Sequence, residues 1–501
     1  MILNVLEYLE TSTTRFPNKK SFSDEWQSYT YGELQNYSKA IGSEIAKRNF
    51  RRKPVIVYME KSIKVVTSFL GILYSGNFYC TIDIEMPLER VKSILDITEP
   101  QVIITDEEHK EAIQSVSSNS EILIYDEIIK TEINQEKLGE IRNTAIDMDP
   151  VYVLFTSGST GVPKGVVITH QSLIDYTEWV ADTFDINEND VLGNQVPFFF
   201  DFSIQDIYAT LKAGATCHIA PRNCFLFPIK LIEFLNEKKV TTIFFVPSVL
   251  SMVTRFKALD DMLPEYLKKV FFAGEVMPTK VLNEWRRKLP NVLYANLFGP
   301  TEITNICTYY VCDRELRDDE SVPIGEACKN IQVVILDEND KAPEVGEVGE
   351  LCVRGRCLAL GYYKNWEKSN EVFVQNPLNH DYRDLIYRTG DLVKVNELGE
   401  ILYAGRKDYQ IKHMGHRIEL GEIEAAAGVV KEIDVSVCLY DDQKKKIVLF
   451  YKGKKVEDSV IKEQLKARIP DYMMPGKLIR VSDFPYNANG KINRLALKEM
   501  F

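Results

Sequence analysis

The chain has 501 residues, of which 45% are hydrophobic and 27% are charged, and its formal net charge is −12. At roughly 150 residues per domain this length predicts two to four structural units, and the composition is that of a soluble globular protein. The net negative charge argues against nucleic acid as a main partner, because backbone phosphates would be repelled. With no basic leader segment, no apolar run of about 18 residues and nine cysteines without a C-x-x-C pair, we expect a cytoplasmic protein that makes no membrane contact.

Between about residues 53 and 330, short runs rich in Val, Ile, Phe and Tyr alternate with segments of helical period. The predicted strands are 53–59, 100–106, 151–157, 241–248 and 269–275, and the predicted helices are 63–76, 203–214 and 228–239. Alternation of this kind predicts an α/β fold with parallel, doubly wound sheets that carry helices on both faces.

The pattern changes twice beyond this region. Short strands broken by Gly and Pro at about 322–404 predict a β-rich subdomain. After "YAGRKD" a helix at 420–430, a strand at 446–453 and a helix at 458–469 predict a small α+β C-terminal domain. We therefore expect a large domain at 1–404, a connection at 405–408 and a small domain at 409–501.

The stretch "LFTSGSTGVPKGVVITH" at 154–170 is typical of a phosphate-binding loop, although it is not a P-loop, because Lys164 follows Pro163 and precedes Gly165. Gly158, Gly161 and Gly165 let backbone N–H groups turn toward an anion. Hydroxyl groups add donors and Lys164 adds a positive charge. A surface turn is the alternative reading. The expected donors beside the glycines are Thr156, Ser157, Ser159, Thr160 and Lys164.

Six polar, glycine-punctuated stretches occur in a fixed order, at the ends of predicted strands in the large domain. They are "TSGSTGVPKG" (156–165), "FFAGE" (271–275), "NLFGPTE" (296–302), "YRTGD" (387–391), "GRKDYQIKHMGHRIELGEIE" (405–424) and "NGKINR" (489–494). Together they resemble the AMP-forming adenylating superfamily of acyl-CoA synthetases, luciferases and nonribosomal peptide synthetase adenylation domains. The resemblance is strongest to amino-acid adenylation domains and to the stand-alone D-alanine–carrier protein ligases.

The resemblance implies a reaction in two steps. The loop would hold the β- and γ-phosphates of ATP while a substrate carboxylate attacks the α-phosphate, which yields an acyl adenylate and pyrophosphate. The acyl group would then pass to the phosphopantetheine thiol of a separate carrier protein. Asp408 would be the hinge about which a mobile small domain rotates, and Gly415 would border the pantetheine channel, with Lys407, Lys412 and Arg417 available for carrier docking.

The same resemblance implies roles in the ATP site. Glu302 would bind Mg²⁺, and Phe298 would stack on adenine in place of the usual tyrosine. Asp391 would accept the ribose hydroxyls, and Arg406 would reach the nucleotide. Lys491 would stabilise the two anions that meet at the α-phosphate. The expected catalytic residues are Thr156, Lys164, Glu302 and Lys491. The other expected ATP-binding residues are Ser157, Gly158, Ser159, Thr160, Gly161, Gly274, Glu275, Asn296, Leu297, Phe298, Gly299, Thr301, Asp391 and Arg406.

An amino acid is the expected substrate, because Asp201 matches the aspartate that pairs with the α-ammonium group in amino-acid adenylating relatives. The other expected substrate-binding residues are Phe202, Gln205, Phe245, Phe271, Ala273, Leu297, Asn305 and Ile306. This set contains no second charge, which predicts a small or neutral side chain, with proline slightly ahead of alanine. Core packing is the alternative reading for Phe202, Phe245 and Phe271.

Two other functions fit parts of the sequence. An acyl- or aryl-CoA ligase would use the same adenylate chemistry, but Asp201 would then be buried without a partner. A non-catalytic nucleotide-binding module would not need the charged residues of the motifs. His413 and His416 are expected to be surface histidines, since no third metal ligand accompanies them.

Overall fold

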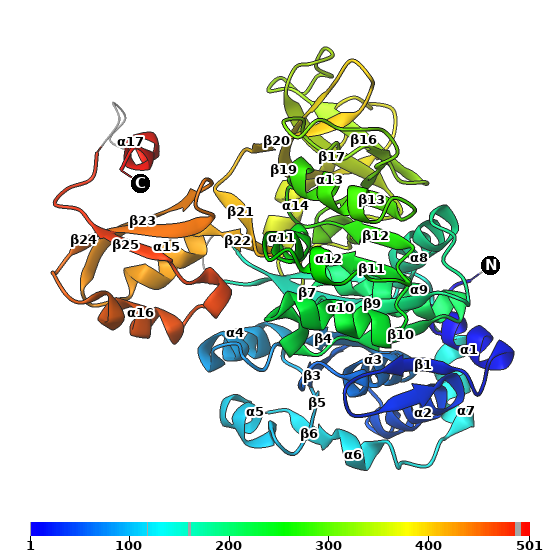
Figure 1. The fold of residues 1–501 in the computed structure, drawn as a ribbon. Helices are drawn as coiled ribbons and strands as arrows, with labels where there is room; N and C mark the ends of the chain where they lie inside the picture. Colours follow the sequence, from blue (N-terminus) through cyan, green and yellow to red (C-terminus); the bar gives the residue numbers. More distant parts are fainter. Residues whose placement is uncertain (1, 118, 159–161, 486–491, 501) are drawn as a thin grey trace.

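The larger part of the chain is built on two sheets, as the computed structural model of the protein shows (Figure 1). The structure describes residues 2–117, 119–158, 162–485 and 492–500. The first sheet has six strands in the order β6 (Glu121–Ile124), β5 (Val102–Thr105), β3 (Pro54–Tyr58), β4 (Phe78–Thr81), β7 (Pro150–Thr156) and β8 (Lys164–Thr169). Its strands are parallel except for β8, which forms an antiparallel hairpin with β7.

The second sheet has nine strands. Their order is β15 (Glu326–Ala327), β14 (Thr308–Val311), β13 (Leu293–Phe298), β12 (Lys269–Phe272), β11 (Thr242–Phe245), β9 (Val191–Asn194), β10 (Thr216–Ile219), β1 (Lys20–Ser23) and β2 (Ser28–Thr30). The strands from β13 to β1 run parallel, and antiparallel strands close both ends. The α/β prediction is confirmed, but both sheets are mixed rather than purely parallel.

Helices lie on both faces of these sheets. Helix α3 (Ile63–Tyr74) packs on the first sheet and α9 (Ile204–Ala213) on the second, and both are buried along nearly their whole length. Helix α8 (His170–Thr183) contacts both β8 and α9, so it bridges the sheets. A helix that is apolar on most sides needs such cover on more than one face. The predicted strands and helices of this region are all present.

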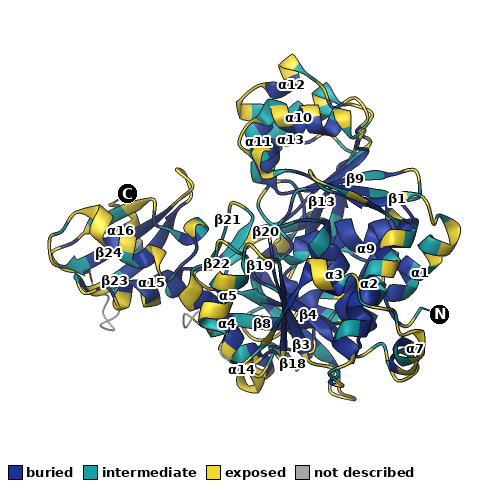
Figure 2. Ribbon diagram, turned by 90° about the horizontal axis from the view of Figure 1, so that it is seen from below, coloured by how far each residue is buried: buried dark blue, intermediate teal, exposed yellow. Residues whose placement is uncertain are grey.

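The remaining helices of the large domain cover the outer faces and edges. They are α1 (Leu6–Arg15), α2 (Tyr31–Ala46), α4 (Leu88–Thr98), α5 (Lys110–Val116), α6 (Tyr125–Ile128), α7 (Gln135–Asn143), α10 (Pro228–Glu237), α11 (Pro247–Arg255), α12 (Ala258–Asp261) and α13 (Thr279–Lys288). Figure 2 shows exposed residues gathered on their outward sides and on the loops. None of the described helices is long and apolar enough to span a membrane.

A β-rich unit follows the second sheet, where the Gly- and Pro-rich texture predicts one. Its strands are β16 (Ile331–Leu336), β17 (Gly349–Gly355), β18 (Phe373–Gln375), β19 (Leu385–Val395) and β20 (Ile401–Arg406), with helix α14 (Trp366–Val372) beside them. Leu351, Val353 and Tyr387 pack in a hydrophobic cluster that also includes Phe298 and Ile303 from the end of the second sheet, so the unit is joined to that sheet.

The last part of the chain lies to one side of the large domain in both views (Figures 1 and 2). It starts with the hairpin β21 (Gln410–His413) and β22 (His416–Glu419). It continues with α15 (Leu420–Gly428), β23 (Ile433–Asp441), β24 (Lys446–Gly453), α16 (Asp458–Lys466), β25 (Lys477–Arg480) and α17 (Arg494–Lys498). Its hydrophobic clusters contain only residues after 410. The predicted connection at 405–408 falls where β20 ends and before β21 begins.

All nine cysteines of the chain are buried, and none forms a disulfide. They are distributed over the large domain, the β-rich unit and the small domain.

Candidate functional site

A cavity of about 190 Å³ lies between the large domain and the β21–β22 hairpin. Residues at or just beyond the ends of β7, β9, β12 and β13 form one wall, and residues of the hairpin form the other. The carboxyl ends of parallel strands are where open α/β sheets bind ligands. We call this space the site cavity.

The predicted phosphate loop connects β7 with β8 beside the site cavity. Thr156 Oγ1 donates a hydrogen bond to the carbonyl oxygen of Lys164, at 3.4 Å. A Cβ atom on Gly158 would lie 1.9 Å from the carbonyl oxygen of Val162, so only glycine fits there. Ser159, Thr160 and Gly161 lie outside the described residues, so the structure does not place these three expected donors.

Lys164 begins β8 and points toward the small domain. Its ammonium nitrogen lies 3.5 Å from Oε1 of Glu419 and 5.4 Å from the ring centroid of Tyr362. Burial lowers the pKa of Lys164, and the nearby Arg417 lowers it further, while Glu302 and Glu419 act in the opposite direction. Lys164 is thus a desolvated cation that is held beside an anion.

Glu302 lies in the short 3-10 turn Thr301–Ile303 that follows β13, and its side chain is fully buried. Its carboxylate accepts hydrogen bonds from the hydroxyl of Tyr362, at 2.8 Å, and from Nη1 of Arg417, at 2.6 Å. Burial alone would raise the pKa of Glu302, but the charges of Arg417 and Lys164 outweigh it and lower the pKa to about 2. The group is an ionised hard oxygen donor, which fits a Mg²⁺ ligand.

The hairpin is fastened to the large domain by hydrogen bonds at strand β22 and at the turn before it. Ser157 Oγ donates to the carbonyl oxygen of Arg417, at 2.9 Å, and accepts from the backbone N–H of Glu419, at 3.1 Å. The backbone N–H of Gly415 donates to Oε1 of Glu275, at 2.9 Å. Gly415 has a φ of +80°, and a Cβ atom there would lie 2.9 Å from Cγ1 of Val246. A side chain at Gly415 would therefore be strained and crowded.

The expected ribose and hinge residues form one ion-pair network. Arg406 Nη1 lies 2.8 Å from Asp391 Oδ1, and Nε lies 2.7 Å from Asp408 Oδ1. Burial opposes the charge of Arg406, but Asp408 and Asp391 outweigh it and raise its pKa above the usual value. The ammonium of Lys412 lies 4.5 Å from the ring centroid of Phe298, over the surface expected to stack on adenine.

The other expected ATP-binding residues lie around these groups. Gly274, Gly299 and Thr301 line the site cavity, whereas Leu297 belongs to the core and Asn296 donates to the carbonyl oxygen of Pro323, at 2.7 Å. Lys491 lies outside the described residues.

The expected substrate residues divide into two groups. Asp201, Phe202, Ala273, Asn305 and Ile306 line the site cavity. Four others are buried without lining it: Gln205, Phe245, Phe271 and Leu297.

Aromatic packing explains the burial of Phe271. Its ring stacks on Phe244, with centroids 4.6 Å apart. It also packs against Phe184, with centroids 4.5 Å apart and the rings tilted by 49°. Core packing is thus the observed role of this ring.

Behind the site cavity, three polar side chains form a buried network. Gln205 Oε1 accepts hydrogen bonds from Tyr176, at 3.0 Å, and from Asn305 Nδ2, at 2.5 Å. Asn305 Nδ2 also contacts the Tyr176 hydroxyl, at 3.1 Å. Tyr176 and Tyr362 were missed by sequence reasoning, because each is a single aromatic residue outside the motifs. Only the tertiary structure brings them to Asn305 and Glu302.

Two expectations about surface residues are wrong. Lys412 and Arg417 face inward to Phe298 and Glu302 instead of presenting a docking surface, whereas Lys407 stays exposed and pairs with Glu350 at 3.0 Å. His416 is not a surface histidine, because its ring stacks on Tyr472 with centroids 3.7 Å apart. The hairpin folds over the large domain and thereby partly covers Lys412, His416 and Arg417.

Comparison with known proteins agrees with this geometry. Residues 9–363 match the family described as AMP-binding enzyme. The chain belongs to this family. It is an adenylate-forming ligase, as the order of its motifs predicts.

The chain is 33% identical to zwittermicin A synthase ZmaJ of Bacillus cereus, over 98% of this chain and 94% of that protein. It is 29% identical to the D-alanine–D-alanyl carrier protein ligase of Bacillus licheniformis, over 100% of this chain and 99% of that protein. It spans less than half the length of the gramicidin S and tyrocidine synthases that it also matches. The Vibrio cholerae adenylation domain AlmE, solved with glycyl-adenosine-5′-phosphate, has the same fold, with a TM-score of 0.85 and 20% identity over 100% of this chain and 98% of that chain.

Proposed function

We propose that this enzyme activates an amino acid as its aminoacyl adenylate and then transfers the aminoacyl group to the phosphopantetheine thiol of a separate carrier protein. In the first step a carboxylate oxygen of the amino acid bonds to the α-phosphorus of ATP, and the bond to the leaving pyrophosphate breaks. In the second step the thiolate attacks the aminoacyl carbonyl, and the bond to AMP breaks. The similarity to carrier protein ligases over nearly their whole length supports the second step.

The observation that carries an amino-acid substrate is the state of Asp201. This carboxylate lines the site cavity and forms no ion pair with any described residue. Burial raises its pKa, while the neighbouring Thr301 acts in the opposite direction. An α-ammonium group would supply the missing positive charge, whereas an acyl chain would leave the carboxylate unpaired. The apolar neighbours Phe202, Ala273 and Ile306 favour a small or neutral side chain, with proline ahead of alanine.

The nucleotide roles remain those that the motifs predict. Lys164 and the loop residues would bind the phosphates of ATP, Asp391 and Arg406 the ribose side, and Lys491 the α-phosphate. Glu302 would hold Mg²⁺, which when bound offsets the charge of the phosphate oxygens. Buried ionised groups at fixed positions stabilise a developing charge without the reorganisation that water requires.

We further propose that the large domain (1–404) and the small domain (409–501) rotate about 405–408, with Asp408 as the hinge. In the described arrangement Lys164 and Glu302 are paired with Glu419 and Arg417, and Gly415 lies at the site cavity. This arrangement fits the second step, in which a pantetheine arm enters beside Gly415 and the polyphosphate has left. The first step would need the other orientation, which brings Lys491 to the site.

The experiment is a pyrophosphate-release assay with the full panel of amino acids, ATP and Mg²⁺. We expect release of pyrophosphate with a small or neutral amino acid, and mass spectrometry should find that amino acid on a phosphopantetheinylated carrier protein. Formation of ADP and orthophosphate would overturn the reaction. Efficient thioester formation on free coenzyme A would place the enzyme among acyl-CoA ligases.

A further inference from the structure

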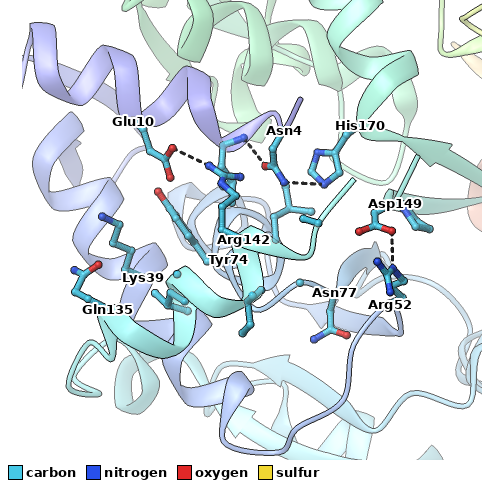
Figure 3. Close-up of a pocket in the computed structure, with 18 residues that line it drawn as sticks. Asn4, Glu10, Lys39, Arg52, Tyr74, Asn77, Gln135, Arg142, Asp149 and His170 are labelled. Atoms are coloured by element: carbon cyan, nitrogen blue, oxygen red, sulfur yellow. Dashed lines mark hydrogen bonds and ion pairs between the residues drawn. The ribbon is translucent and has the colours of Figure 1, made fainter. Parts of the chain in front are cut away.

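A second cavity, of about 240 Å³, lies in the large domain among four helices, α1, α2, α3 and α7 (Figure 3). We call it the helical cavity. It borders Pro150 at the start of β7, whereas the phosphate loop follows Thr156 at the other end of that strand. At about 3.3 Å per residue the two places are about 20 Å apart, so the helical cavity is not an extension of the site cavity.

Four charged or polar side chains, one from each helix, converge on this space: Glu10, Lys39, Tyr74 and Arg142 (Figure 3). Arg142 Nη2 lies 2.7 Å from Oε2 of Glu10, so these two charges compensate each other. Lys39 forms no ion pair with any described residue, and its ammonium lies 5.8 Å from the ring centroid of Tyr74. One uncompensated cation therefore faces this part of the helical cavity.

Two hydrogen-bond donors at the same end have no partner. Nη1 of Arg142 is buried and makes no hydrogen bond to a described residue. The hydroxyl of Tyr74, a side chain only 7% exposed, is also buried and makes no close hydrogen bond to a described residue, although Glu10 and Gln35 lie near it. Burial raises the pKa of Tyr74, and the nearby Glu10 raises it further, so the hydroxyl keeps its proton and remains a donor. Buried donors without partners are rare in folded proteins.

The opposite end of the helical cavity does not offer a second anion site. Arg52 Nε lies 2.6 Å from Asp149 Oδ1, and burial lowers the pKa of His170 to about 3, so the ring is neutral. His170 Nδ1 accepts a hydrogen bond from the backbone N–H of Val5, at 3.2 Å. The anion-binding character is thus restricted to the end that contains Lys39.

Apolar side chains form the rest of the wall. They are Leu6, Leu73, Leu138 and Ile141, each less than 9% exposed. The volume is below the roughly 300–1,000 Å³ of sites for drug-sized ligands, so the ligand must be small.

From these features we propose that the helical cavity is a second ligand site, which binds a small carboxylic acid with a compact apolar body. The carboxylate lies against Lys39, Nη1 of Arg142 and the hydroxyl of Tyr74, which together supply a positive charge and three donors. The apolar body lies against Leu73 and Leu138. Carboxylate binding satisfies donors to which no described residue offers a close acceptor.

Isothermal titration calorimetry with benzoate and with isovalerate tests the proposal on the full chain. Lys39→Met retains the side-chain stem and removes the charge, so we expect it to weaken the Kd of the bound acid about tenfold or more. Lys280→Met is the matched control, because Lys280 is an exposed helical lysine that forms no ion pair with a described residue. The control should bind as the wild type does.

A second variant closes the mouth of the helical cavity without removing a charge. Gly139 is exposed within α7, and a Cβ atom there would meet nothing within 4 Å, so larger residues are compatible with the fold. Gly139→Trp should abolish binding and Gly139→Ala should retain it, with unchanged thermal unfolding as the check on folding. Absence of binding by both acids, or equal binding by wild type and Lys39→Met, would overturn the site. Tighter binding of inorganic phosphate than of either acid would overturn the carboxylic acid assignment.

Discussion

The ammonium nitrogen of Lys164 lies 3.5 Å from the carboxylate of Glu419, across the interface between the two parts of the chain. Two residues earlier on the same strand, Arg417 pairs with Glu302. Strand β22 therefore places an anion beside the lysine expected to bind phosphate and a cation beside the carboxylate expected to bind metal. If the polyphosphate binds where the motifs predict, it and β22 compete for Lys164 and Glu302.

Arg417→Met should slow the second step more than the first. The change leaves Glu302 as a buried carboxylate with one charged partner fewer in the described arrangement, and breaking a buried pair costs about 3–5 kcal/mol. We expect aminoacyl transfer from preformed adenylate to fall by about 10²-fold or more, while pyrophosphate release changes by less than about tenfold. Arg417→Lys should recover part of the transfer rate. Equal losses in the two half-reactions would contradict this division.

Asp201→Ala should remove the preference for an amino acid over the corresponding acid without an amino group. The carboxylate is expected to pair with the ammonium group, and loss of a buried charge pair costs several kcal/mol. We expect kcat/KM for the amino acid to fall by about 10²-fold or more, while the des-amino acid improves relative to it. Pyrophosphate release measures both substrates. An unchanged ratio would show that Asp201 does not contact the ammonium group.

Arg90 of α4 and Glu422 of α15 form an ion pair between the large and small domains, with side chains only 6% and 3% exposed. Arg90→Met should reduce the population of the described arrangement, because Glu422 would lose its partner in a buried place. The double variant Arg90→Met/Glu422→Leu should recover it, since two apolar side chains can replace a buried pair. A fluorescence-transfer pair on the two domains reports the population. Failure of the double variant to recover would argue against a role for the charges.

His416 makes the described arrangement depend on pH. Its ring lies edge-on to Phe200 of the large domain, with centroids 4.6 Å apart. Burial and the neighbouring His413 lower its pKa to about 3, and we expect separation from Phe200 to return it toward about 6.5. The arrangement that buries His416 binds fewer protons, so its stability is complete above about pH 6.5 and is lost as the pH falls toward 3. At pH 5.5 the loss is about 1.4 kcal/mol, or about tenfold in population.

His416→Phe removes the titrating group and keeps an aromatic ring against Tyr472. Single-turnover transfer to the carrier, measured at pH 7.5 and pH 5.5 for both proteins, isolates the effect, because the thiol chemistry is common to both. Between pH 7.5 and pH 5.5 the transfer rate of the wild type should fall by a factor about tenfold larger than the factor for the variant. Identical pH dependence would exclude His416 as the cause.

The regular elements could be predicted from sequence because their patterns are local. Continuous apolar runs such as 53–59 and helical periods such as 63–76 report burial directly, and the structure contains β3 and α3 there. The division into two sheets and the antiparallel β8 were not predictable in this way. Strand order depends on contacts between segments far apart in the sequence, and the apolar run of β8 does not encode its direction.

The candidate site, too, could be predicted only in part, because contacts between segments far apart in the sequence determine its geometry. The motifs predict that Gly158, Lys164 and Glu302 belong to one site, and the structure brings Lys164 and Glu302 to the same arginine. Their roles toward ATP remain predictions. The inward positions of Lys412 and Arg417 were not predictable, because a charged residue in a hairpin is usually solvated. The hydrogen bonds of the β21–β22 hairpin to Ser157 and Glu275 determine which face of the hairpin is covered, and these contacts are known only from the tertiary structure.

The burial of all nine cysteines has a consequence for the fate of the activated acyl group. The acyl adenylate is a mixed anhydride, which reacts readily with thiolates. An enzyme that makes such a compound is exposed to acylation of its own side chains. Burial raises the pKa of each of the nine thiols, so each is both inaccessible and protonated. None of the nine thiols is therefore placed to compete for the activated acyl group with the phosphopantetheine thiol that we propose as its acceptor.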